Sequence, residues 1–371
     1  MSHELREPFH KPLLRGAYSA ALGVHGLLTL PWRGSREEPR LFYGGARSGD
    51  VGGTLVKIQR LRQIFPEHRW SYNLVYALSN SPYLPGMALS LLKLRGIPMV
   101  HNQNGVFYPG WYSGDWQGRN RRMARTYLQA DHVFYQSDFC RRAAERFLGR
   151  REGPGEILFN GVDTGFYRPR PEFTQPRSPY VFLLTGKIDA HLAYRVETTM
   201  RGLAKARRQG LEARLIVAGW VEPQSLLALL ALAEELKIAD HVRFTGPYRQ
   251  DQAPEIYQQA DAYVMTKHND PCPNTVMEAL ACGLPVVHVQ SGGAPEQVGE
   301  AGIGVATGGE DWERILIPEA GALGRAMMTA AEHHAAWSEA ARRRAVERFD
   351  LAHWIRRHHE VFQYLLQRAD G

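Results

Sequence analysis

The sequence predicts an α/β protein made of two Rossmann-like domains, each with a parallel sheet. Short apolar runs alternate with segments of helical periodicity along most of the chain, which is the pattern of βαβ units with right-handed crossovers. One segment, residues 169–179, interrupts this alternation, and its four prolines are typical of a semi-rigid linker. The length of 371 residues suits two domains of ordinary size.

In the first half, a glycine-rich turn at residues 44–53 connects the first expected strand to a helix. Strand, glycine turn and helix in this order suit the close approach of a phosphate, and a plain tight turn is the alternative. We expect strands at residues 41–43, 72–76, 97–100, 132–135 and 157–159, and helices at 54–65, 85–95, 118–129 and 138–148. Residues 1–39, rich in proline, glycine and arginine, are expected to be irregular.

The second half repeats the same pattern after the linker. We expect strands at residues 181–184, 214–218, 242–245, 262–265 and 285–289, and helices at 194–209, 223–236, 253–259, 274–282 and 294–298. Residues 323–349 are mostly helical in pattern, and residues 350–367 predict a final amphipathic helix. No short-period repeat is present, so the two halves repeat an architecture and not a sequence.

The composition, with 44% hydrophobic and 22% charged residues, is that of a soluble globular protein. The three cysteines, Cys140, Cys272 and Cys282, are scattered and odd in number, which favours reduced thiols in a cytosolic setting over disulfides or a zinc cluster. The apolar stretch at residues 17–32 is too short and too interrupted for a transmembrane helix, and no clean signal-peptide cleavage site follows it. We therefore expect a cytoplasmic protein.

The formal charge of +7 is concentrated in arginine clusters at residues 119–125, 141–151 and 342–344. A solvated basic face is the simplest interpretation, and a phosphate-bearing acceptor or an anionic membrane surface is the next. Peripheral contact with the inner membrane face therefore stays an open alternative. Nucleic acid is not expected as a partner, because no recognised binding module accompanies the charge.

The most informative stretch, residues 267–289, predicts a loop, a helix and a buried strand. Asn274 or Thr275 can cap the start of the helix. Asp270 on the loop and Glu278 in the helix lie eight positions apart, so both can face a ligand at the helix N-terminus. Backbone N–H groups at that end suit a phosphate, and carboxylates suit sugar hydroxyls.

This stretch resembles the E-x7-E signature of retaining glycosyltransferases of family 4, with Asp270 in place of the first glutamate. Residues 157–169 resemble the family's N-G-V-D segment, which closes the first domain, and residues 186–188 resemble its G-R-I/L segment. The resemblance implies the GT-B architecture, in which two parallel sheets face a central cleft. It implies an acceptor-binding domain at residues 1–168, to which a C-terminal helix at about 350–371 returns, and a nucleotide-sugar domain at residues 169–349.

The resemblance also implies a donor site. Lys187 and Arg195 would neutralise the diphosphate, although Arg195 stands further along the chain than the family's second basic residue. Glu278 would hold the ribose and Asp270 the donor sugar. Further donor contacts would come from the backbone of Asn274, Thr275 and Val276 and from the glycine turn at Gly52 and Gly53.

In the first domain, Asn104 aligns with a family histidine that lies beside the donor sugar. An amide can hold a sugar hydroxyl, but it cannot replace a histidine in proton transfer. Aromatic faces stack on sugar rings, so the aromatic segment at residues 107–116 is expected to form an acceptor wall, with packing in the core as the alternative. The candidate acceptor contacts are His101, Tyr108, Trp111 and Trp116.

The implied function is that of a retaining hexosyltransferase in carbohydrate biosynthesis, which moves a sugar from a UDP- or GDP-sugar to a hydroxyl of a glycan, a lipid-linked or a small-molecule acceptor. The implied catalytic residues are Asp270, Asn104, Lys187 and Glu278. No D-x-D motif occurs, so we expect no metal and no other cofactor, and no pair of acids is placed for a covalent glycosyl-enzyme. A GT-B sugar-nucleotide epimerase and a catalytically inactive carbohydrate-binding protein are the alternatives.

Overall fold

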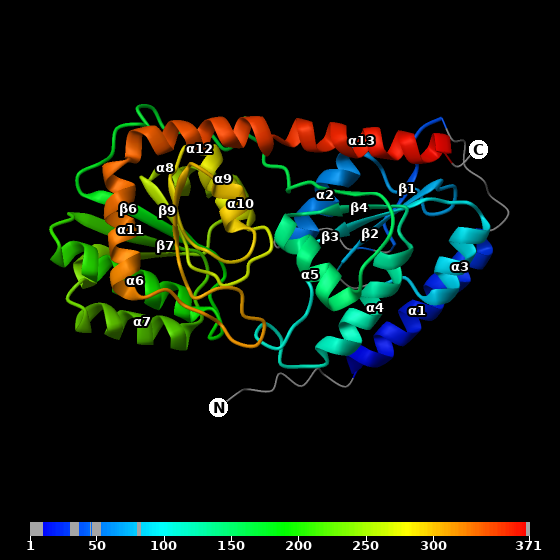
Figure 1. Ribbon diagram of the computed structural model, residues 1–371, viewed down its shortest axis with the longest axis horizontal. Coiled ribbons are helices and arrows are strands. Elements are labelled where there is room, and N and C mark those ends of the chain that lie inside the picture. The colour runs from blue at the N-terminus through cyan, green and yellow to red at the C-terminus, as the bar shows by residue number, and fades with distance from the viewer. Residues whose placement is uncertain (1–9, 30–36, 45, 47–52, 80–82, 369–371) are drawn as a thin grey trace. The chain divides into compact units, whose positions relative to one another are not determined.

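The structure, a computed structural model, describes residues 10–29, 37–44, 46, 53–79 and 83–368 (Figure 1). The chain divides into two compact units. Unit 1 comprises Met1–Asn160, Trp312–Arg314 and Ala352–Gly371, and unit 2 comprises Gly161–Asp311 and Ile315–Leu351. Each unit contains a parallel sheet with helices, so the predicted α/β class is confirmed.

The described part of unit 1 contains a parallel sheet in the order β1-β2-β3-β4-β5. Its strands are β1 (Leu41–Phe42), β2 (Leu74–Leu78), β3 (Met99–Gln103), β4 (His132–Tyr135) and β5 (Gly155–Ile157). Its helices are α1 (His10–Leu28), α2 (Gly53–Ile64), α3 (Gly86–Leu94), α4 (Trp116–Gln129), α5 (Asp138–Leu148) and nearly all of α13 (Leu351–Arg368). Strands β2 to β4 are fully buried, as expected for a parallel sheet covered on both faces.

Helix α1 occupies a region that the sequence predicted to be irregular. Glycines inside a helix weaken the helical signal, and α1 contains three of them. The structure gives two of them a packing reason. A Cβ on Gly23 would lie 2.2 Å from the Met87 methyl carbon, and one on Gly26 would lie 3.1 Å from Leu91. Helix α1 therefore packs closely on α3 at both positions, although the Met87 methyl is the end of a flexible side chain that can move aside.

The described part of unit 2 contains a parallel sheet in the order β11-β10-β9-β6-β7-β8. Its strands are β6 (Tyr180–Thr185), β7 (Ala213–Ala218), β8 (Val242–Gly246), β9 (Ala262–Met265), β10 (Val286–Val289) and β11 (Gly302–Val305). Its helices are α6 (Ala193–Arg208), α7 (Pro223–Glu235), α8 (Ala253–Gln258), α9 (Asn274–Ala281), α10 (Ala294–Val298), α11 (Ala320–Glu332) and α12 (His334–Arg348). Strand β11 was missed by the sequence analysis because two of its four residues are glycines.

The main core of unit 2 lies between the sheet and helices α6, α7 and α11, while α9 and α10 cover the other face (Figure 1). Residues 169–179, expected as a linker, are held to unit 2 by a buried carboxylate. Asp261 is 0% exposed and forms salt bridges with Arg170 at 3.1 Å and with Arg177 at 3.0 Å. A buried carboxylate is costly unless cations compensate its charge. The two arginines therefore hold this segment against unit 2.

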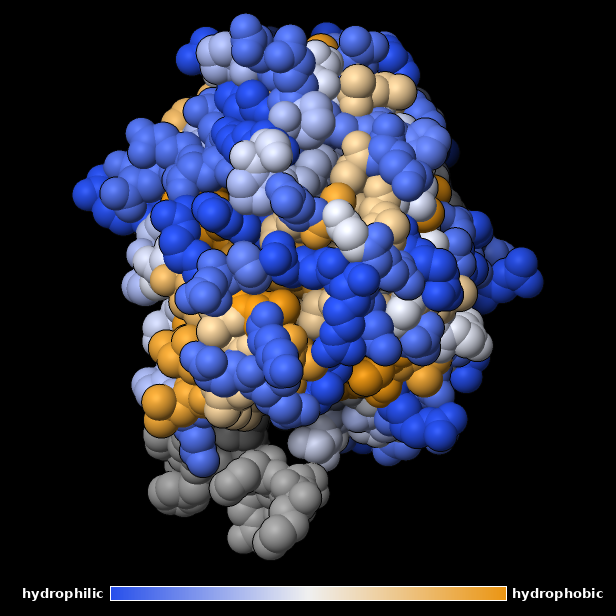
Figure 2. Space-filling view, turned by 90° about the vertical axis from the view of Figure 1, so that its left-hand side faces the viewer, coloured by the Kyte–Doolittle hydropathy of each residue, from blue (hydrophilic) through white to orange (hydrophobic). Residues whose placement is uncertain are grey.

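The surface on the side of α7 is mostly hydrophilic, with smaller apolar areas (Figure 2). Leu227 and Leu230 of α7 are among the exposed apolar residues, at 70% and 44%. All three cysteines are buried. Within the part of the chain that the structure describes, no helix is long and apolar enough to cross a bilayer.

Candidate active site

The candidate residues of unit 2 follow two neighbouring strands. From β6 the sheet grows through β7 to β8, and the chain then returns to the other side of β6 with β9, β10 and β11. The strand order therefore reverses between β6 and β9. Open parallel sheets bind ligands outside the carboxyl ends of their strands at such a reversal. Lys187 follows β6 directly, and Asp270 lies on the loop after β9.

Arg195, in the first turn of α6, connects the ends of these two strands. Its Nη2 donates to the Thr185 carbonyl oxygen at 3.3 Å and lies 3.8 Å from the Met265 sulfur. Arg195 is only 5% exposed, and its buried Nε has no hydrogen-bond partner in the structure. A buried guanidinium whose described partners are neutral has unused capacity for an anion.

Lys187 is exposed at the same edge, and its ammonium lies 5.1 Å from the centre of the Trp220 ring. Trp220 follows β7 and is 39% exposed. The approach of the two loops depends on Gly219, because a Cβ there would lie 2.1 Å from the Gly186 carbonyl oxygen. The sequence analysis missed Trp220, although an aromatic residue directly after a glycine at the end of a buried strand was a usable signal.

Asp270 is paired with Lys267, whose Nζ lies 2.8 Å from Oδ2. Its Oδ1 accepts a 3.3 Å hydrogen bond from the Cys272 amide, and the Gly293 amide donates to its carbonyl at 2.8 Å. Gly292, at φ +70°, permits this contact, since a Cβ there would lie 2.4 Å from the Asp270 carbonyl oxygen. The Asp270 side chain is 16% exposed, so it is both fixed and reachable. Lys267 was not singled out from the sequence, although its spacing of three residues from an acid was visible.

Glu278 is held by a tyrosine that the sequence analysis also missed. The hydroxyl of Tyr257, on α8, donates to Glu278 Oε2 at 2.8 Å. Thr185 Oγ1 lies 3.5 Å from that hydroxyl and 3.0 Å from the hydroxyl of Tyr263. Burial, and then the nearby Glu278 carboxylate, raise the pKa of Tyr257 well above its usual range, so the phenol stays protonated and remains the donor.

Helix α9 begins between the two acids. The predicted cap at Asn274 or Thr275 is wrong, because the N-cap is Pro273, in extended conformation, and no side chain caps the helix. The Val276 amide donates to the Pro273 carbonyl at 3.1 Å, so it does not offer the ligand contact expected of it. Asn274 and Thr275 occupy the first two positions of the helix.

In unit 1, Asn104 follows β3, with its amide donating to Ser79 Oγ at 3.0 Å and its side chain half-buried. His101 lies within β3, because this strand continues to Gln103 instead of ending at residue 100. Its side chain is 0% exposed, and its Nε2 lies 2.9 Å from Gln103 Oε1. Burial lowers the pKa of His101 to about 4, so the ring is neutral at pH 7. The acceptor assignment therefore does not hold for His101.

The aromatic segment after this strand divides between the core and the surface. Tyr108 is buried, and its ring meets that of Trp312 edge-on at 4.9 Å, so it is a core residue and not an acceptor contact. Trp116 is half-buried and packs edge-on against Phe147 at 6.0 Å. Trp111 is 44% exposed and stays available to a ligand.

The expected glycine turn falls largely outside the described residues. Gly52 lies outside them, and Gly53 is the first residue of α2. Near it, the structure contains a buried polar cluster that the sequence did not indicate. Lys57 Nζ and Gln136 Nε2 both donate to Asn102 Oδ1, at 2.6 Å and 2.7 Å.

Comparison with known families gives two matches, one in each half. The family described as Glycosyltransferase Family 4 matches residues 25–166, and the family described as Glycosyl transferases group 1 matches residues 171–344. Two parallel α/β units with these matches define a protein of the GT-B class. Each half of the chain is therefore similar to one part of the family 4 (group 1) glycosyltransferases.

Curated relatives and solved structures agree with this class. The D-inositol 3-phosphate glycosyltransferase of Thermobispora bispora is 33% identical over 42% of this chain and 39% of its own length. That of Saccharomonospora viridis is 29% identical over 65% of this chain and 61% of its own. The chain therefore spans less than two thirds of the length of both relatives. Anabaena HepE in complex with UDP-glucose shares the fold with a TM-score of 0.64 at 18% identity, over 88% of this chain and 100% of that one. Sucrose-phosphate synthase from Thermosynechococcus elongatus gives 0.62 at 17% identity, over 81% and 75%.

Proposed function

We propose that this protein transfers a hexose from a nucleotide-sugar donor to a hydroxyl acceptor. The observation that carries the proposal is the reversal of strand order between β6 and β9, where two cations and two anchored acids lie. Lys187, Arg195 and the start of α9 suit a diphosphate. Glu278 and Asp270 suit the hydroxyls on either side of it. Together these groups correspond to the successive parts of a nucleotide sugar.

The proposed roles follow from the contacts of each side chain. Departure of the nucleoside diphosphate increases negative charge on its terminal phosphate, so a cation there binds the transition state more tightly than the ground state. Arg195 is already fixed by Thr185 and Met265, and the exposed Lys187 is free to approach the phosphate. Within unit 2, Glu278 would hold the ribose and Asp270 the sugar.

We propose retention of configuration without a covalent glycosyl-enzyme and without a metal ion. Asp270 is neutralised by Lys267, which makes it a poor nucleophile, and Glu278 is engaged by Tyr257. Among the described residues, no group of three His, Cys, Asp or Glu side chains is placed to hold a metal. Lys187 and Arg195 would supply the positive charge that a divalent ion supplies elsewhere.

The test is to incubate the protein with UDP- and GDP-sugars, with and without acceptors, and to measure released nucleotide and isomerised sugar. UDP-glucose is the first donor to try because HepE was solved with it, and D-inositol 3-phosphate is the first acceptor because the curated relatives carry its name. Acceptor-dependent nucleotide release supports transfer. Isomerisation without acceptor would support an epimerase, and binding without turnover an inactive carbohydrate-binding protein. Lys187→Ala should raise the activation free energy of transfer by roughly 2–4 kcal/mol. Lys205→Ala, at an exposed position of α6, is the control and should not raise it.

A further inference from the structure

The outward face of α1 in unit 1 is apolar over residues 17–28, as far as the structure describes their side chains. Six of its exposed residues recur at helical spacing and form a stripe, here called the α1 stripe: Ala17, Ala20, Ala21, Val24, Leu27 and Leu28. Gly16 and Tyr18 are also exposed. Val24, Leu27 and Leu28 are 53%, 47% and 58% exposed. An apolar stripe on a helix normally faces a core, so this one requires an explanation.

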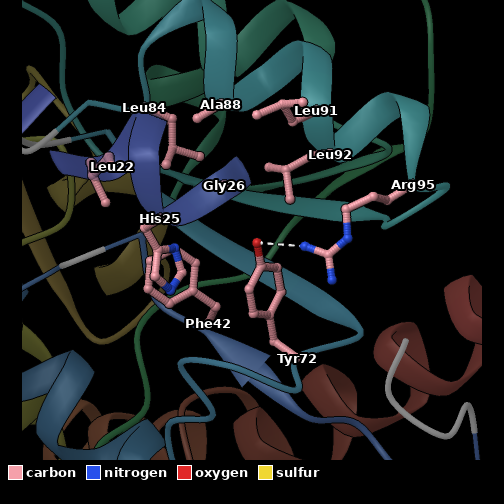
Figure 3. Close-up of a pocket in the computed structure, with 10 residues that line it drawn as sticks. All are labelled: Leu22, His25, Gly26, Phe42, Tyr72, Leu84, Ala88, Leu91, Leu92 and Arg95. Carbon is pink, nitrogen blue, oxygen red and sulfur yellow. Dashed lines mark hydrogen bonds between the residues drawn. The ribbon is translucent and has the colours of Figure 1, made fainter. Parts of the chain in front are cut away.

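Helix α1 cannot turn this stripe inward, because its opposite face is already occupied. Leu22, His25 and Gly26 line a pocket that α3 completes, with Arg95 at one end (Figure 3). Arg95 Nη1 donates to the Tyr72 hydroxyl at 2.9 Å and to Thr29 Oγ1 at 3.0 Å. These bonds fix the C-terminal end of α1 to the rest of unit 1, so the α1 stripe remains exposed to solvent.

Neighbouring side chains enlarge the apolar surface. Met87 and Leu94 of α3, which packs beside α1 (Figure 1), are 49% and 77% exposed. Trp70, 50% exposed, lies 5.5 Å from the ring of His25. An indole at the margin of an apolar surface suits the boundary between lipid headgroups and acyl chains.

The acids nearest to α4 lie at its two ends, where Asp115, its N-cap, and Asp131 are exposed. Helices α1, α3 and α4 contain no aspartate or glutamate. Lys93 of α3 and Arg121 and Arg125 of α4 are exposed, and α4 packs against α3. A two-fold interface between copies of this chain would bring these cations together with no acid on the three helices to compensate them. An anionic lipid surface complements both the apolar and the basic residues.

We propose that this face of unit 1, formed by the α1 stripe with α3 and α4, docks on the surface of an anionic phospholipid membrane. Helix α1 lies in the plane of the interface, with its stripe buried at the headgroup boundary, and the basic residues attract anionic headgroups. This docking goes beyond the proposed transfer reaction and does not depend on it.

The test is flotation of the full chain with phosphatidylcholine vesicles that contain or lack phosphatidylglycerol. We expect binding to the anionic vesicles alone, weakened by salt. Val24→Ser with Leu28→Ser, and separately Arg121→Ala with Arg125→Ala, should each lower the partition coefficient by about tenfold or more. The matched controls are Leu227→Ser with Leu230→Ser, which are exposed apolar residues of α7, and Lys205→Ala with Arg208→Ala, which are exposed cations of α6. Both controls should bind like the wild type.

Equal binding to neutral vesicles, absence of binding, or an equal loss in the controls would overturn the proposal. So would a dimer in solution that Val24→Ser with Leu28→Ser dissociates, since the stripe would then be a subunit interface. If the apolar variant fails to fold, as judged by circular dichroism, the arginine variant at exposed helix positions carries the test. Nucleotide binding is measured in a separate experiment without vesicles. The flotation result therefore stays interpretable even if the proposed transfer reaction is wrong.

Discussion

Arg195 is a residue at which stability and the proposed function make opposite demands. It is a buried cation with neutral described partners, and such a group costs free energy of folding until an anion reaches it. The same arrangement would favour binding of a diphosphate, as proposed above. Function and stability are therefore expected to oppose each other at this position.

Arg195→Met should raise the melting temperature of the ligand-free protein, or leave it unchanged, and should remove the stabilisation that UDP gives to the wild type. Methionine fills most of the same space without a buried charge. Thermal unfolding with and without UDP measures both effects. If Arg195→Met instead lowers the melting temperature as much as the truncation of a core residue does, then Arg195 stabilises the folded protein.

Substitutions of the two acids should have different effects, because the proposed roles assign them to different parts of the donor. Glu278→Gln should weaken the binding of free UDP as well as that of the UDP-sugar, by roughly 1–3 kcal/mol for a lost charged hydrogen bond. Asp270→Asn should leave UDP binding nearly intact and lower transfer. Calorimetric titration with UDP measures the affinity of each variant. If Asp270→Asn weakens UDP binding as much as Glu278→Gln does, the roles proposed for the two acids are wrong.

Tyr257 is a positioning residue for Glu278. Tyr257→Phe removes the 2.8 Å hydrogen bond that orients the carboxylate, with little change of shape. We expect UDP affinity to fall by roughly 0.5–1.5 kcal/mol and KM for the donor to rise, with kcat little changed. The control is Tyr364→Phe, because Tyr364 is exposed on α13. A fall in kcat at constant KM would assign Tyr257 to the chemical step instead.

Among the elements, α13 is attached to unit 1 through a buried histidine. His358 Nε2 lies 2.9 Å from the Tyr76 hydroxyl of β2, and its Nδ1 lies 2.8 Å from the Trp354 carbonyl oxygen. Burial is the main cause that lowers the pKa of His358 to about 3. An unfolded histidine titrates near 6.5, so between these values the unfolded state binds more protons than the folded one.

The free energy of unfolding should therefore fall as the pH falls below about 6.5, by about 1.4 kcal/mol per pH unit for each histidine of this kind. His101 and His288, with pKa values lowered to about 4 by burial, act in the same direction. His358→Gln keeps an amide at the position but does not titrate, so it should reduce the slope by about one proton. Urea unfolding across this pH range measures the slope. An unchanged slope would mean that His358 is charged in the folded protein.

For the molecule as a whole, the cations of unit 2 are expected to replace a metal ion. Transfer should persist in EDTA and should not increase with Mg²⁺ or Mn²⁺, because Lys187 and Arg195 together carry the charge of one divalent ion. Initial rates with and without chelator are the measurement. Full loss in EDTA, restored by Mn²⁺, would contradict this account of the diphosphate site.

The α/β class and most elements could be predicted from the sequence, because buried parallel strands appear in it as local apolar runs. Strands β4 and β9 and helices α5 and α10 have the expected boundaries. The sequence also indicated Asp270 and Glu278, since their spacing along one loop and helix is a local property. It failed at α1, where packing against α3 overrides the low helix propensity of glycine.

Only the tertiary structure decided which of these residues act together. The contacts of Arg195 with Thr185 and Met265 exist because β9 returns to the side of β6. Tyr257 reaches Glu278 across 21 positions of the chain, and α1 displays an apolar stripe only because its other face is occupied. Strand order and packing between distant segments leave no periodicity in a sequence, since they are fixed by which buried surfaces fit one another.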